Sequence, residues 1–205
     1  MIVPQKLHVE TPLAKAMFKL MQELEGRLGL TTEVDVYLAG GMAAHLYTCY
    51  RSTSDIDAEF SRSFPVPQDL VIEFEGEDGQ CQVLYFDTNY NLSFALMHRD
   101  YQHDAHPVTA YNGYFKVFTL APVDLALSKV ARLSPIDKQD VTRLAAARLV
   151  SSDELQQRAD EALADYIVNP VMLEHNIRDA VEVVKEAETA LKADATASSL
   201  DSAPS

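Results

Sequence analysis

The sequence has few cysteines, no long apolar run and little positive charge, and each absence excludes a class of protein. Two cysteines, Cys49 and Cys81, are too few for a disulfide scaffold, so we expect reduced thiols in a cytoplasmic protein. No apolar stretch approaches the ~20 residues that a membrane helix needs. The N-terminus lacks a basic start followed by an apolar stretch, so it does not resemble a secretory signal.

The shortage of positive charge bears on whether the protein can bind nucleic acid. Seventeen Lys and Arg residues stand against 31 Asp and Glu, which gives a net charge of −14. Broad, nonspecific nucleic-acid binding relies on basic surface that neutralises phosphates, so this balance weighs against it but leaves a local basic site open. Apolar residues make up 47% of the chain, which suits a globular domain.

Periodicity predicts the order of the elements. Helical spacing of apolar residues indicates a helix over 12–28, and the sequence then predicts mostly strands, followed by helices only. We expect strands at 34–38, 55–60, 69–74, 81–86, 92–97 and 114–120, a short helix after Gly41, and helices from Pro122, from Pro135, over 153–167 and on to about Ala193.

This order predicts an α+β fold with a mixed sheet flanked by helices and an all-helical C-terminal part. We place an α/β core at 1–121 and a helical part packed on it at 122–193. The tail, 194–205, has Leu200 as its one large apolar side chain, so we expect it to be disordered.

The segment from Leu38 to Phe60 carries the chemistry. A strand ends at Gly40 and Gly41, and a helix starts there, where unpaired N–H groups and absent side chains suit an anion such as a triphosphate. Asp55 and Asp57 follow, two residues apart on a predicted strand, so their side chains point the same way. Two carboxylates held together repel unless a cation lies between them, and Mg²⁺ prefers such oxygen ligands.

These residues resemble the first motif of the nucleotidyltransferase superfamily, which has the DNA polymerase β-like fold. The string from Arg51 to Asp57, Arg-Ser-Thr-Ser-Asp-Ile-Asp, looks most like the AbiEii-type toxin nucleotidyltransferases and related bacterial proteins. The resemblance implies that Gly40, Gly41, Arg51 and Thr53 bind nucleotide and that Asp55 and Asp57 bind metal. Many relatives have Ser where this chain has Gly41, whose contacts would come from the backbone alone.

A second stretch, SKVARLSPIDKQDV, resembles a later motif of the same group. Lys129 would reach the triphosphate, and Arg132, Asp137 and Asp140 would support the site; a salt bridge at a helix junction is the alternative for Arg132 and Asp140. Relatives usually have Lys where this chain has Ile136.

The resemblance implies transfer of a nucleoside monophosphate from an NTP to an RNA, protein or small-molecule hydroxyl, with Mg²⁺ or Mn²⁺ as cofactor. A third carboxylate would activate the acceptor, with Asp87 as first candidate and Asp104 as second. The acceptor could be a tRNA end or a protein, and a cognate antitoxin or toxin would be the partner in a toxin–antitoxin or phage-defence system.

Two other hypotheses remain. The first is a catalytically inactive protein of the same fold that acts as a binding or antitoxin-like interaction module, as Gly41 and Ile136 would allow. The second is a hydrolase that uses His98, His103 and His106 with Asp100 and Asp104. Their spacing matches no zinc pattern, which favours a polar loop.

Overall fold

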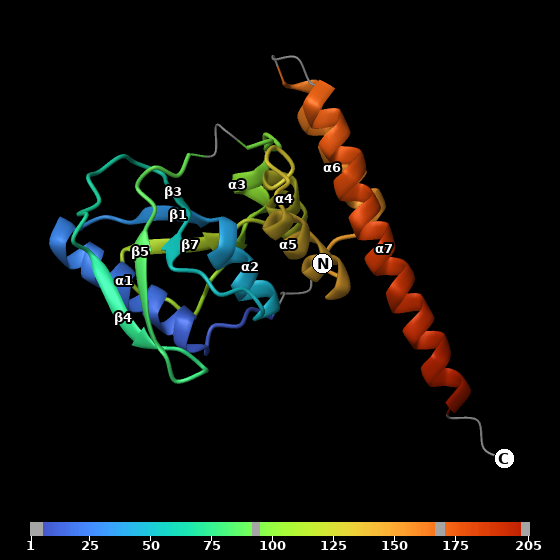
Figure 1. Cartoon of the computed structure of the whole chain (residues 1–205). Coiled ribbons are helices and arrows are strands. Elements are labelled where there is room, and N and C mark those ends of the chain that lie inside the picture. Colours follow the sequence, from blue (N-terminus) through green and yellow to red (C-terminus); the bar gives the residue numbers. More distant parts are fainter. Residues whose placement is uncertain (1–5, 92–94, 167–170, 202–205) are drawn as a thin grey trace. The chain divides into compact units, whose positions relative to one another are not determined.

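The computed structural model describes residues 6–91, 95–166 and 171–201, and the chain divides into two compact units. Unit 1 contains residues up to 94 and residues 99–121, and unit 2 contains residues 95–98 and the chain from Pro122 onward. The fold is α+β, as the sequence predicted, with helices and strands in the first unit and helices alone in the second. Figure 1 labels the helices and strands of both units.

The first element of unit 1 is α1 (Pro12–Leu28). Residues in the sequence define both ends of this helix. The Thr11 hydroxyl accepts a hydrogen bond from Ala14 N–H at 3.2 Å, and Pro12 occupies the first turn, where a missing N–H costs nothing. Gly29 ends the helix in the left-handed region, with φ 58°. The apolar face of α1 is fully buried, and the helix contacts β4 (Val71–Glu75) and β5 (Cys81–Phe86).

The predicted single sheet is two sheets. The first has the order β3-β1-β7-β6, with β1 (Val34–Leu38) parallel to β7 (Phe115–Thr119) and antiparallel to β3 (Ala58–Phe60). The second has the order β2-β5-β4, with β2 (Asp55–Ile56) parallel to β5 and β4 antiparallel to it. In β1, Val34, Val36 and Leu38 are buried and alternate with half-buried Asp35 and Tyr37, which is the period of a strand with one covered face.

The predicted strand at 55–60 is therefore interrupted. The chain passes from one sheet to the other at Asp57, which belongs to neither β2 nor β3. Alternation in the sequence is the same on both sides of this residue, so the pattern did not show the change of partner strand.

The predicted strand at 92–97 is wrong where it can be examined. Residues 92–94 lie outside the described part of the chain, and Ala95–Met97 form no strand. Leu96 is fully buried, and His98 Nε2 lies 3.3 Å from a Glu161 carboxylate oxygen in unit 2. Packing on the helices thus decides the conformation of this apolar stretch, against its strand propensity.

Two short elements occupy the stretch that the sequence left as a loop. These are α3 (Tyr101–Asp104) and β6 (His106–Pro107), which pairs antiparallel with β7. The short helix predicted after Gly41 is α2 (Gly40–Thr48), and Cys49 ends it with φ 58°.

Unit 2 consists of α4 (Pro122–Ser128), α5 (Pro135–Ala146), α6 (Ser152–Ala164) and α7 (Val171–Asp201). Capping boxes begin α5 (Ser134 with Asp137) and α6 (Ser151 with Glu154). A buried ion pair joins α4 to α6, because Arg158 Nη2 lies 2.7 Å from Asp124 Oδ2. The backbone N–H of Ser152, at the start of α6, donates to Glu188 of α7 at 2.9 Å.

The last helix extends beyond the end that the sequence indicated near Ala193, and reaches Asp201. The stretch from Ala193 to Asp201 contains no Gly or Pro and is rich in Ala, the strongest helix former, so nothing in it stops a helix that has already begun. In the described part of the chain, no helix is long and apolar enough to cross a membrane.

Candidate nucleotidyltransferase site

The predicted glycine turn and the predicted Asp pair meet in unit 1. Gly40 has φ 55°, in the left-handed region that glycine tolerates, and it begins α2 directly after β1. A Cβ built on Gly40 would lie 1.6 Å from Oδ2 of Asp57, so the carboxylate occupies the space that a side chain would take. A backbone hydrogen bond joins the same two segments, because Ala39 N–H donates to Asp57 C=O at 2.9 Å.

Gly41 faces the same loop. A Cβ on Gly41 would lie 2.8 Å from the hydroxyl oxygen of Thr53 and 2.9 Å from its Cβ. The Thr53 hydroxyl in turn donates to Asp55 Oδ1 at 2.6 Å. The Ser that many nucleotidyltransferases carry at position 41 therefore has no room here, because Thr53 supplies a hydroxyl in the same place.

Asp55 and Asp57 are both half-buried and flank Ile56, which is completely buried. Asp57 lies against Gly40, and Asp55 accepts from the Thr53 hydroxyl, which lies against Gly41, so both carboxylates lie near the glycine turn. A hollow of about 590 Å³ adjoins Asp55. Its other lining residues are Arg51 to Ser54 and Cys81 to Val83, so hydroxyl groups and one guanidinium line it beside the carboxylate.

The helix start beside the Asp pair offers backbone donors. Ala39 is the N-cap of α2 and its side chain makes no capping hydrogen bond. The first N–H groups of a helix carry partial positive charge and suit an anion, so a phosphate could bind here next to a metal held by Asp55 and Asp57.

His45 positions the loop that carries Arg51. Its Nδ1 lies 2.7 Å from Arg51 C=O, and its Nε2 lies 2.7 Å from the Thr11 hydroxyl, which ties the loop to the start of α1. Burial lowers the pKa of His45, and the bond to Arg51 opposes that shift only in part. The ring is therefore neutral near pH 7, with one nitrogen as donor and the other as acceptor.

The candidate third carboxylates lie on different elements. Asp87 directly follows β5, and its N–H donates to Ile56 C=O at 3.1 Å, so the parallel register brings it level with Asp57. One Asp87 oxygen accepts from Asn89 N–H at 2.8 Å. Asp104 is the last residue of α3.

Sequence reasoning missed Glu59 and two tyrosines. Glu59, in β3, follows Asp57 by two residues and accepts a hydrogen bond from the Tyr101 hydroxyl at 2.5 Å. Burial raises the pKa of Tyr90, and the charges of Asp57 and Glu59 raise it further. The D-I-D-A-E alternation was the available signal for Glu59.

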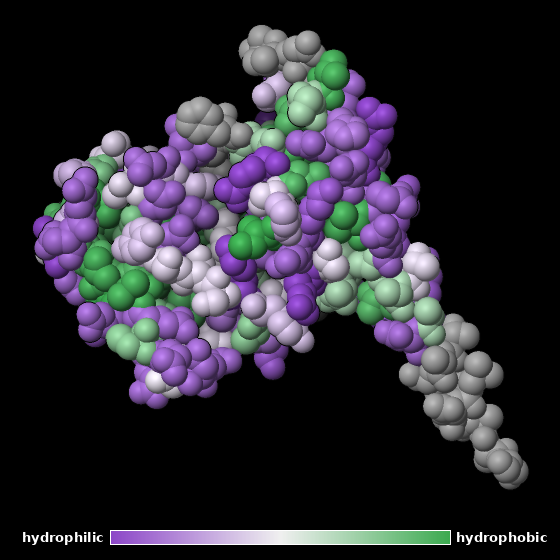
Figure 2. Space-filling model, in the orientation of Figure 1, coloured by the Kyte–Doolittle hydropathy of each residue, from purple (hydrophilic) through white to green (hydrophobic). Residues whose placement is uncertain are grey.

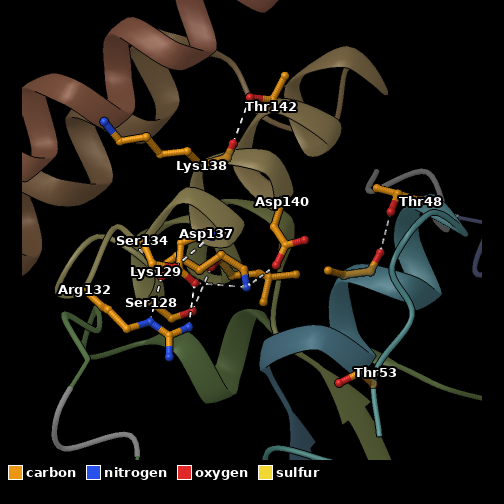
Figure 3. Close-up of polar contacts among 12 residues, drawn as sticks. Thr48, Thr53, Ser128, Lys129, Arg132, Ser134, Asp137, Lys138, Asp140 and Thr142 are labelled. Carbon is orange, nitrogen blue, oxygen red and sulfur yellow. Dashed lines mark hydrogen bonds and ion pairs between the residues drawn. The ribbon is translucent and has the colours of Figure 1, made fainter. Parts of the chain in front are cut away.

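In unit 2, the residues of the second motif bind one another (Figure 3). Lys129 Nζ lies 2.7 Å from Asp140 and 3.9 Å from Asp137, and all three side chains are buried. Arg132 donates two hydrogen bonds of 2.8 Å to Asp137, which also caps α5 through Ser134. Burial acts to raise the pKa of Asp137, but the bonds from Arg132 and Ser134 outweigh it and hold that pKa below its usual value.

The three histidines of the competing hypothesis do not gather. His98 binds Glu161 in unit 2, His106 Nδ1 lies 3.0 Å from the Tyr47 hydroxyl in unit 1, and His103 lies on α3. Throughout the described residues, no group of three or more His, Cys, Asp or Glu side chains is arranged to hold a metal ion. Magnesium is commonly bound by one or two carboxylates with phosphates and waters as its other ligands, so the Asp55 and Asp57 pair still fits it.

A glycine turn therefore lies against the Asp55–Asp57 segment at the start of α2. The family model described as "Nucleotidyltransferase of unknown function (DUF6036)" matches residues 15–187, and the chain belongs to this family. Comparison with curated proteins and with solved structures finds no match. The family supports the superfamily that the sequence indicated, and closeness to AbiEii-type toxins stays a prediction.

Proposed function

We propose that this protein transfers a nucleoside monophosphate from an NTP to a hydroxyl group, with Asp55 and Asp57 as ligands of Mg²⁺ or Mn²⁺. When bound, the metal would neutralise charge on the α-phosphate and on the leaving pyrophosphate. The acceptor oxygen forms a bond to the α-phosphorus, and the bond from that phosphorus to the bridging oxygen breaks. Pyrophosphate leaves, and the hydroxyl proton passes to a carboxylate, for which Asp87 is the candidate.

The observation that carries this proposal is the contact between Gly40 and Asp57. It brings a metal-ligating carboxylate against the start of α2, where backbone donors suit a phosphate. The hollow beside Asp55, with Arg51 and three hydroxyl residues, would bind further phosphate oxygens. Membership of a nucleotidyltransferase family supports the same chemistry.

Thr53 has a positioning role in the proposal. Its hydroxyl donates to Asp55 Oδ1, which leaves the other carboxylate oxygen to face a cation. By resemblance to AbiEii-type proteins, a cognate partner from a toxin–antitoxin or phage-defence system would regulate the enzyme. Lys129 stays a predicted phosphate contact, and its buried ion pair with Asp140 is the alternative role that must be separated from it.

The test is incubation of the full chain with each α-labelled NTP, Mg²⁺ and a cell lysate. Label on one macromolecule, lost in Asp57→Asn and on addition of EDTA, supports the proposal. Stabilisation by Mg²⁺-NTP without any label would favour the inactive binding module. The absence of both label and stabilisation by NTP would contradict the proposal.

A further inference from the structure

A second hollow lies beyond Asp57, in unit 1. Its volume is about 510 Å³, and its lining comes from the segments 58–68 and 86–91. Ala58, Glu59 and Asp87 all line it, so it begins one residue from the proposed metal ligand Asp57 and includes the proposed proton acceptor. This size is within the range of ~300–1,000 Å³ that is typical of binding pockets.

Part of the wall of this hollow is aromatic. Phe60 and Phe64 lie with ring centroids 4.6 Å apart, and Phe60 and Phe86 with centroids 5.7 Å apart. Tyr90 also lines the hollow. Such walls accept an apolar or aromatic side chain, and such rings bind a cation over their faces as well.

The charge around the hollow is negative. Two acidic residues, Glu59 and Asp87, are in its lining. The one basic residue in the lining is Arg62, whose guanidinium donates to the Thr32 hydroxyl at 3.2 Å. A nucleic-acid acceptor would need several basic groups along its phosphates, and the lining supplies Arg62 alone.

Glu59 is fixed within this negative site. The Tyr101 hydroxyl donates to it, and Tyr101 packs edge-on against Tyr37, with ring centroids 6.4 Å apart. Tyr37 pairs with Glu59 in the β1–β3 ladder. A carboxylate held in place by a tyrosine beside aromatic walls can bind an ammonium or guanidinium group on an incoming chain.

We propose that this hollow receives the acceptor, and that the acceptor is a side-chain hydroxyl of a basic polypeptide segment. The inference rests on the proposed nucleotidyl transfer and names its acceptor class. Glu59 binds a cationic group next to the reacting hydroxyl, and the aromatic walls hold the neighbouring side chain. The hydroxyl oxygen attacks the α-phosphorus, its proton passes to Asp87, and pyrophosphate leaves from the opposite side.

The experiment uses three defined acceptors: poly(Lys,Tyr), poly(Glu,Tyr) and tRNA. Each is incubated with the full chain, Mg²⁺ and α-labelled NTP. Opposite charge raises association rates by about 10–10³-fold, so we expect poly(Lys,Tyr) to be labelled at least about tenfold faster than poly(Glu,Tyr), and tRNA not at all. Glu59→Gln should reduce this ratio severalfold, whereas the control Glu73→Gln, on the exposed side of β4, should not.

Thermal stabilisation by Mg²⁺-NTP is measured on every variant and separates the two proposals. Stabilisation together with label on tRNA, or with no label on either copolymer, overturns the acceptor assignment and leaves NTP binding intact. Equal effects of Glu59→Gln and Glu73→Gln also overturn it. Absence of stabilisation in the wild-type chain overturns the proposed nucleotidyl transfer, and the acceptor assignment with it.

Discussion

The carboxylate of Asp57 lies against Gly40, so close that any Cβ at position 40 would overlap it. This contact explains why the turn needs glycine. The left-handed φ of 55° would strain another residue by itself, and the missing side chain is also the space that Asp57 uses.

We therefore predict that Gly40→Ala both destabilises unit 1 and abolishes binding of Mg²⁺-NTP. The strain of a left-handed alanine is roughly 1–2 kcal/mol before the clash with Asp57 is added. Thermal unfolding with and without Mg²⁺-NTP measures both effects. The matched control is Gly26→Ala, because a Cβ there has nothing within 4 Å and replaces a helical glycine. Equal melting temperatures for the two variants would contradict the account.

A second prediction concerns Gly41 and Thr53, whose side-chain spaces overlap. Gly41→Ser should be destabilising alone, because its Cβ would lie 2.8 Å from the Thr53 hydroxyl oxygen, which Thr53→Ala removes. Combined with Thr53→Ala, it should be better tolerated, and the added serine hydroxyl should restore part of the NTP binding that Thr53→Ala removes. A double-mutant cycle on unfolding free energies measures this coupling, for which we expect about 0.5–3 kcal/mol. Strictly additive effects would show that the two positions do not compete.

The buried pair of Lys129 and Asp140 gives the third prediction. Lys129→Met leaves buried carboxylates without their ammonium partner, which costs about 3–5 kcal/mol. The double variant Lys129→Met/Asp140→Leu should regain much of that loss, since it removes both charges. Lys15→Met, which breaks the exposed pair with Glu10, is the control and should change stability by less than about 1 kcal/mol.

The double variant also separates the two roles of Lys129. It folds without the ion pair, so any loss of NTP binding reflects a direct contact of Lys129 with nucleotide. Retained NTP affinity in a folded double variant would contradict the predicted phosphate contact and assign Lys129 to stability alone.

The fourth prediction is a pH dependence that comes from His45. Its folded-state pKa is lowered by burial, so the unfolded chain takes up a proton more readily than the folded protein. The contribution of neutral His45 to the free energy of unfolding is fully present above the unfolded-state pKa of about 6.5. This contribution is lost as the pH falls below that value. His106 is shifted in the same direction, also by burial.

The measurement is the free energy of unfolding in denaturant between pH 7.5 and pH 5.5. In the wild type, the free energy of unfolding should fall as the pH falls. His45→Gln should reduce this slope, and the slope that remains should include the contribution of His106. A wild-type profile that rises on acidification would show that the ring is protonated and paired in the folded state.

How much the sequence could predict differs between elements. The α1 boundaries follow from Thr11, Pro12 and Gly29, because caps act locally and need no knowledge of the rest of the fold. The change of sheet at Asp57 could not be predicted, because it depends on which distant strands pair with each half of the segment. The stretch at Ala95–Met97 is apolar enough for a strand, and only its packing on unit 2 decides otherwise.

For the site, the spacing of Gly40, Gly41, Asp55 and Asp57 predicted two segments that the structure brings into contact. The contact that joins the turn to the Asp pair, the Thr53 hydroxyl at the place of the missing serine, and the tyrosine on Glu59 come from chain crossings that are not encoded locally. The exposed apolar side chains of the second sheet, Val71, Val83 and Tyr85, likewise follow from strand register; Figure 2 shows apolar surface over β4 and β5.

The most direct test is calorimetric titration of the full chain with each NTP, with and without Mg²⁺, on wild type, Asp57→Asn and the exposed control Glu73→Gln. The account predicts metal-dependent binding of at least one NTP to the wild type and the control. In Asp57→Asn, which changes a charge but little volume, that binding should be lost while the protein stays folded. Metal-independent binding of equal affinity in wild type and Asp57→Asn would contradict the assignment of this strand as the site of nucleotidyl transfer.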